Sequence, residues 1–169
     1  MFEAWHDFYL LQGGAAATLV ALLFVAASIG IGYLTTKRLR DARAFMNPVV
    51  VHFTAVFAAS ALALALAPLR IPALFLLAVG GGATAGIVYS VVATRRVMKL
   101  TNDRIDRMGY GLVPALAYAA IIAAMWLIWS GFAFGTDVLA GALLLLLIVN
   151  IRNAWDLTVD LVRRNSERG

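Results

Sequence analysis

Long runs of apolar residues follow one another along the chain, and they restrict its possible folds more than any other feature. One run, GALLLLLIV at Gly141–Val149, continues directly into the polar sequence NIRNAWDLTVD at Asn150–Asp160. A helix needs about 20 mostly apolar residues to cross a membrane. The sequence therefore predicts an all-α membrane protein with one domain, a bundle of five transmembrane helices. The stretches that meet the length requirement are residues 10–34, 48–67, 71–93, 111–132 and 137–162.

The composition excludes a soluble domain. Of the 169 residues, 63% are hydrophobic and 14% are charged, whereas about a quarter of the residues in a soluble domain are charged. The chain has no cysteine, which excludes disulfides, thiolate metal sites and a cysteine nucleophile. The first residues, MFEAWHDF, carry no positive charge, so we expect no cleaved signal peptide.

Residues that begin or end helices lie between the apolar runs. Asn47 followed by Pro48 is typical of a helix N-cap and first turn. The sequence APLRIP at residues 67–72 predicts a tight turn. Thr136 is a candidate N-cap for the last helix, and Asp137 would favour the positive end of that helix.

The distribution of lysine and arginine predicts the orientation. The first connection, the third connection and the C-terminal end carry four, five and four basic residues, whereas the N-terminus and the fourth connection carry none and the second carries one. Basic connections remain in the cytoplasm. We therefore expect the N-terminus outside and the C-terminus in the cytoplasm. The same residues favour anionic lipids of the cytoplasmic face as partners, and no pattern of basic and aromatic residues indicates nucleic acid.

The third connection has two interpretations. Its apolar residues have the spacing of a short amphipathic helix, with Asp103 and Arg107 as an i, i+4 pair. The alternative is a solvated basic loop on the membrane surface. The apolar residues concerned are Val97, Leu100, Ile105 and Met108.

A glycine-rich stretch, GGGATAG, lies near the middle of the third predicted helix. Gly82 and Gly86 form the GxxxG pattern that lets two helices approach closely. The stretch, which also holds Gly80 and Gly81, is thus a candidate packing surface. The alternative is a broken helix whose backbone lines a pore or a ligand cavity.

Polar residues gather toward the cytoplasmic ends of the predicted helices. Counted from Asp137, Asn150 and Arg152 lie roughly 20 and 22 Å along the last helix, within a hydrocarbon layer about 30 Å thick. Arg152 and Asp156 are spaced to pair. Such residues usually face the protein interior, although polar residues at helix ends also join helices without further function. We predict a polar pocket open to the cytoplasm, formed by His52, Asn47, Asn150, Arg152, Asn153 and Asp156.

Several classes of membrane protein do not fit. Both lysines lie in predicted cytoplasmic connections, which excludes a retinal Schiff base. No acidic residue lies near the predicted midplane, which disfavours a proton-coupled exchanger. No metal-binding, phosphate-binding or serine-hydrolase motif is present. His6 and His52 lie on opposite membrane faces, so a haem held by two histidines is excluded, and we expect no cofactor or metal.

The segment WHDFYLLQGGAAATLVALLFVAASI, Trp5–Ile29, resembles the opening of an uncharacterised family of small bacterial inner-membrane proteins. RNAWDL, Arg152–Leu157, resembles a recurrent ending in the same family. Ala21 stands where the family usually has glycine. The resemblance implies a location in a bacterial inner membrane and carries no activity. The matching residues of the first segment are Trp5, Asp7, Phe8, Tyr9, Gly13, Ala15, Ala16, Ala17, Leu19, Leu22, Phe24, Val25, Ala26 and Ser28.

The sequence supports three functional hypotheses. The first is a small homo-oligomeric channel or passive transport protein, in which the glycines and the polar pocket line a pore. The second is a non-catalytic membrane module that binds a lipid headgroup or a partner membrane protein. The third is an enzyme with His52 and Asp156 as an acid–base pair, which meets only part of the requirements of a catalytic site. The first hypothesis is favoured over the other two.

Overall fold

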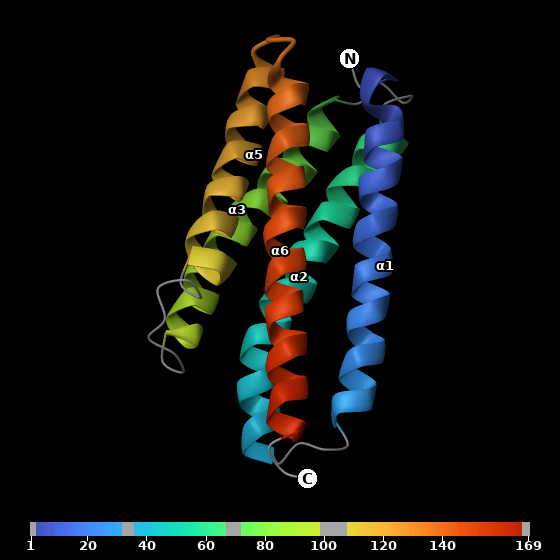
Figure 1. The fold of residues 1–169 in the computed structure, drawn as a ribbon. Helices are drawn as coiled ribbons and strands as arrows, with labels where there is room; N and C mark the ends of the chain where they lie inside the picture. The colour runs from blue at the N-terminus through green and yellow to red at the C-terminus, as the bar shows by residue number, and fades with distance from the viewer. Residues whose placement is uncertain (1–2, 32–35, 67–71, 99–107, 167–169) are drawn as a thin grey trace.

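The protein folds into a bundle of long helices (Figure 1). The computed structural model describes residues 3–31, 36–66, 72–98 and 108–166, and the structural statements below concern these residues. Five helices are long and apolar enough to cross a membrane, as predicted, which indicates a multi-pass membrane protein. The elements are η1 (Glu3–Trp5), α1 (His6–Ile31), α2 (Thr36–Leu66), α3 (Pro72–Val97), the π-helical turn η2 (Met108–Leu112), α5 (Val113–Trp129) and α6 (Gly135–Ser166).

The helices α2 and α6 form the centre of the bundle (Figure 1). Helix α1 packs against both of them on one flank. On the other flank α3 packs against α2, α5 packs against α6, and α3 and α5 pack against each other. The two ends of the chain lie at opposite ends of the bundle (Figure 1). We call the end where α3 stops and α2 starts the basic end, because Arg95 and Arg96 lie in the last turn of α3.

The outer surface of the bundle is apolar. Leu11 and Leu77 are each 75% exposed, and Trp129 is 72% exposed. An exposed apolar patch of this kind is uncommon on a soluble monomer, whereas lipid tails offer it a matching environment. The helices are therefore apolar both where they pack against each other and where they face outward.

Helix α2 begins earlier than the sequence predicts. It starts at Thr36, so Pro48 lies inside the helix, and the prediction of an N-cap at Asn47 is wrong. The added turns, residues 36–47, are rich in arginine and alanine, which form helices readily. They outweigh the loss of one backbone hydrogen bond at proline. Helices α3 and α6 also extend beyond their predicted ends at residues 93 and 162.

A tight turn joins α5 to α6. Gly131 has a φ of +82°, a left-handed conformation that glycine adopts at low cost, and Phe132 N–H donates to Leu127 O at 3.0 Å. This is the usual way in which a helix ends at glycine. Helix α6 then begins at Gly135, and Thr136 donates its hydroxyl hydrogen to Ala133 O at 3.1 Å. Thr136 is thus inside the helix and is not its N-cap.

A single π-helical turn, η2, precedes α5 where the sequence predicts a regular helix from residue 111. Its two glycines fit between neighbouring elements: a Cβ at Gly111 would collide with the side chain of Thr94, and a Cβ at Gly109 would lie 2.7 Å from Asn153 Oδ1. The predicted amphipathic helix of the third connection falls mostly on residues 99–107, which lie outside the described residues.

Candidate functional site

Three of the predicted site residues lie deep inside the bundle. His52 on α2 and Asn150 on α6 are fully buried, and Asn153 on α6 is 2% exposed. The two helices that carry them form the centre of the bundle. These three predicted residues therefore face the interior of the bundle, from α2 and α6.

The imidazole of His52 is held by two tyrosines. Its Nδ1 lies 2.9 Å from the hydroxyl oxygen of Tyr118 on α5. The ring of Tyr89 on α3 meets the His52 ring edge-on, with 6.0 Å between the ring centroids. Tyr118 was not among the predicted site residues, although a tyrosine in the middle of an alanine-rich transmembrane helix is a signal for a buried hydrogen bond.

The glycine-rich stretch divides into a packed part and an exposed part. A Cβ at Gly86 would lie 2.5 Å from Tyr118 Cε1, and a Cβ at Gly80 would lie 3.6 Å from Met125 Cγ. Among the described residues, no atom lies within 4 Å of a Cβ at Gly81 or Gly82. The packing surface inside the chain is therefore made by Gly80 and Gly86. Because α3 continues unbroken through the whole stretch, the alternative of a broken helix is wrong.

The two buried asparagines make different contacts. The Asn153 side chain donates from Nδ2 to Gly109 O at 2.8 Å, and the backbone carbonyl of Asn153 accepts from the Tyr110 hydroxyl at 3.1 Å. These bonds fix η2 to α6. Asn150 donates from Nδ2 to Leu146 O in its own helix at 2.7 Å. Asn153 thus has a clear role in packing, whereas the side chain of Asn150 makes no hydrogen bond to another helix within the described residues.

Arg152 and Asp156 lie on the outer side of α6. Their side chains are 53% and 49% exposed, and Arg152 Nε lies 3.7 Å from Asp156 Oδ2. The two residues form the predicted i, i+4 pair. They do not share the buried position of His52, so the structure separates the residues that the sequence placed in one pocket.

A groove of about 440 Å³ lies between α2 and α3 toward the basic end. Its walls are mostly apolar. Of the predicted site residues, Asn47 lines this groove. The lining residues are Ala44, Asn47, Pro48, Ala85, Val88, Tyr89, Val92, Ala93 and Arg96.

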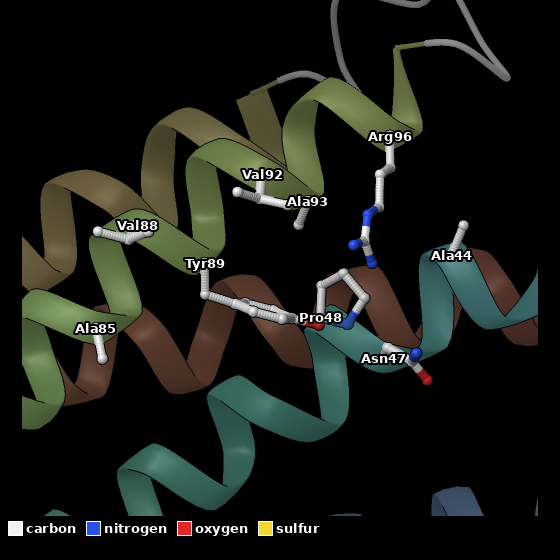
Figure 2. Close-up of a pocket in the computed structure, with 9 residues that line it drawn as sticks. All are labelled: Ala44, Asn47, Pro48, Ala85, Val88, Tyr89, Val92, Ala93 and Arg96. Atoms are coloured by element: carbon white, nitrogen blue, oxygen red, sulfur yellow. The ribbon is translucent and has the colours of Figure 1, made fainter.

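The polar groups of the groove come from both helices. Figure 2 shows the Arg96 side chain reaching from α3 toward Pro48 on α2, while the Tyr89 ring extends across the same space. Asn47 lies at the edge of the groove. Since Tyr89 also contacts the His52 ring, the groove borders the buried imidazole. Arg96 belongs to the third connection predicted from the sequence, so its place in the groove was not predicted.

Metal binding has no support in the described residues, where no group of three or more His, Asp and Glu side chains is placed to hold an ion. Comparisons of the chain with protein families, with curated proteins and with solved structures found no match. The resemblance of the Trp5–Ile29 segment therefore stays a prediction.

Proposed function

We propose that the protein is a non-catalytic membrane module that binds an anionic phospholipid in the groove between α2 and α3. The headgroup phosphate binds Arg96, and an acyl chain follows the apolar wall formed by Ala85, Val88 and Val92. The observation that carries this proposal is a mostly apolar groove with a guanidinium at the end nearest the basic connections. A phospholipid has the same division into apolar and charged parts.

The lining residues of α3 follow one another along a single face of that helix. Ala85, Val88, Val92 and Arg96 are spaced by three or four residues, which places them on one side of a helix. From Ala85 to Arg96 this face extends for roughly 16 Å. Along α3 the apolar residues of this face come before Arg96, which is nearest the basic end. A phospholipid has the same order, with its acyl chains in the membrane interior and its headgroup at the surface.

Arg96 suits phosphate better than a lysine would. The planar guanidinium presents several N–H donors that match phosphate oxygens in a bidentate arrangement. The Tyr89 hydroxyl is a further donor among the lining residues. A basic residue near an anionic membrane surface contributes about 1 kcal/mol of attraction, so the basic end favours anionic lipid even before the groove is occupied.

The proposal includes the orientation of the chain in the membrane and the membrane in which it lies, both as the sequence predicts them. We place the N-terminus outside and the basic end in the cytoplasm, because basic connections remain there. The family resemblance supports the inner membrane of a bacterium. The groove then opens toward the cytoplasmic leaflet, where anionic lipids supply a negative surface potential.

A matched pair of variants tests the groove. In nanodiscs of phosphatidylcholine, added phosphatidylglycerol should raise the melting temperature of the parent protein and saturate. Arg96→Gln should lose most of this rise. Arg95→Gln removes the neighbouring charge, which is exposed and is not among the lining residues, and should retain it. Equal losses in both variants would show that the basic end attracts lipid without a specific groove.

Filling the groove gives an independent test. Val88 is 61% exposed, so Val88→Phe adds bulk to the wall without disturbing the core. We expect the variant to melt like the parent in phosphatidylcholine and to respond less to phosphatidylglycerol. Full retention of the response would place the lipid elsewhere on the bundle.

A homo-oligomeric channel or passive transport protein is the second candidate. Gly81 and Gly82 face outward on α3, and glycines on an outer surface let a helix of another copy approach closely. The mass of the protein in nanodiscs and ion or solute flux from liposomes test this candidate. A monomer without flux would leave lipid binding as the remaining function.

An enzyme that uses His52 and Asp156 has weaker support. His52 is fully buried, whereas the Asp156 side chain is 49% exposed on the outer side of α6. An acid–base pair needs both groups within reach of one reacting atom. The separation of the two side chains favours a non-catalytic protein.

A further inference from the structure

Two buried polar side chains lie at the end of the bundle opposite the basic end. Gln12 on α1 is 3% exposed, and Ser60 on α2 is fully buried. Gln12 shares the buried face of α1 with Ala16, and α1 packs against α2 and α6. Neither residue belongs to the groove or to the surroundings of His52.

Gln12 and Ser60 lie at the same level of the bundle. Gln12 follows the start of α1 by roughly 9 Å, and Ser60 precedes the end of α2 by roughly 9 Å, at the helical rise per residue. The start of α1 and the end of α2 lie at the same end of the bundle (Figure 1). The two helices also approach closely here, because a Cβ at Gly13 would lie 3.1 Å from Ser60 Cβ.

Among the residues that the structure describes, the polar atoms of both side chains have no partner. Within the described part of the chain, Gln12 Oε1, Gln12 Nε2 and Ser60 Oγ are buried and accept or donate no hydrogen bond. Ser60 differs in this from Thr54 and Ser90, whose hydroxyls donate to the carbonyl four residues earlier in their own helix at 2.8 Å. A buried polar group without a partner destabilises the folded protein, so these atoms favour a bound partner from outside the chain.

We propose that Gln12 and Ser60 form a binding site for ordered water inside the bundle. The carboxamide offers two donor hydrogens and an acceptor oxygen, and the hydroxyl both donates and accepts. Buried water typically makes about three hydrogen bonds to such groups. The two side chains carry no charge, and water is the smallest molecule that complements donors and acceptors at one place.

A contact between η1 and α6 lies between this site and the end of the bundle. Trp5 Nε1 donates to Asp137 Oδ1 at 3.2 Å. Trp5 is the last residue of η1, and it precedes Gln12 by roughly 10 Å at the helical rise per residue. The Asp137 carboxylate is exposed and attracts water to this end.

The composition of the chain permits a direct test, because Gln12 is its sole glutamine. Protein labelled with 15N in the glutamine side chain gives one amide signal, from Gln12. In nanodiscs, magnetisation transfer from water to this amide should be several-fold faster than to the buried, hydrogen-bonded side chain of Asn153, observed in a second sample labelled with 15N in the asparagine side chains. Transfer as slow as to Asn153 would overturn the proposal.

Three variants identify the cause of the transfer. Ser60→Ala removes one partner of the water and should slow the transfer to Gln12, whereas Ser90→Ala, which removes a hydroxyl bonded within its own helix, should not change it. A higher melting temperature for Gln12→Met, together with slow transfer in the parent, would instead show an amide buried without any partner.

Discussion

The Tyr118 hydroxyl oxygen lies 2.9 Å from Nδ1 of His52, although 66 residues separate them in the chain. The same tyrosine ring covers Gly86, so one side chain of α5 contacts both α2 and α3. The His52 ring also meets Tyr89, which lines the groove. The packing of these three aromatic rings therefore sets the relative position of the two helices that form the proposed lipid site.

Removing the Tyr118 hydroxyl tests this arrangement. Tyr118→Phe leaves His52 Nδ1 buried without its partner, and we expect a loss of about 1–3 kcal/mol in the free energy of unfolding. Denaturant unfolding in one detergent measures it. The double variant Tyr118→Phe/His52→Leu should recover part of the loss, because it removes both polar partners. A single variant as stable as the parent would mean that the hydrogen bond contributes nothing.

The two glycines of the GxxxG pattern should respond differently to the same substitution. Gly86→Leu places a side chain against the Tyr118 ring and should cost about 1–3 kcal/mol by overpacking. Gly82→Leu points outward among the described residues and should leave the stability of a single chain unchanged. Thermal unfolding compares the two. If Gly82→Leu instead dissociates an oligomer, the channel hypothesis gains support.

The Arg152–Asp156 pair should contribute little to stability. Both side chains are about half exposed, and an exposed ion pair is worth about 0–1 kcal/mol. We expect Arg152→Ala and Asp156→Ala each to lower the free energy of unfolding by less than about 1 kcal/mol. Losses of about 3–5 kcal/mol, typical of a broken buried pair, would show that this face of α6 is covered in the membrane.

Reporter fusions test the orientation. A periplasmic reporter fused within the α5–α6 turn, after Trp129 to Gly135, should be active in the periplasm, and the same reporter fused after Arg104 should be inactive. The reverse result would place the basic end outside. The groove would then open toward the outer leaflet, and the proposed cytoplasmic lipids would be the wrong partners.

The number and order of the helices follow from the sequence because hydropathy alone determines them. A run of about 20 apolar residues has no other stable place than a membrane, so even residues 137–162, with their polar ending, are found in one helix. Helix ends are harder to predict. The prediction at Asn47 failed because proline starts helices more often than it continues them, while tertiary packing decides each individual case.

The candidate site was predictable only in part. Burial of His52, Asn150 and Asn153 follows from the cost of exposing polar groups to lipid. Which face of α6 turns inward depends on contacts with other helices, and the sequence therefore placed Arg152 and Asp156 inside with them. The groove depends on how α2 and α3 separate near Pro48, and this separation has no signature in either helix alone.

Pro48 has a consequence for the choice of lipid. Because proline has no N–H, the Ala44 carbonyl four residues earlier lacks its helical donor, and both residues line the groove with Arg96. We propose that this carbonyl faces the groove and adds a backbone acceptor to the cation. A glycerol headgroup carries phosphate and hydroxyl hydrogens and can satisfy both, whereas phosphatidylmethanol has the same charge and no hydroxyl. We expect phosphatidylglycerol to raise the melting temperature more than phosphatidylmethanol, and an equal rise would limit recognition to charge. If phosphatidylglycerol gives the larger rise, selectivity among equally charged lipids originates from a hydrogen bond that the backbone of α2 does not make.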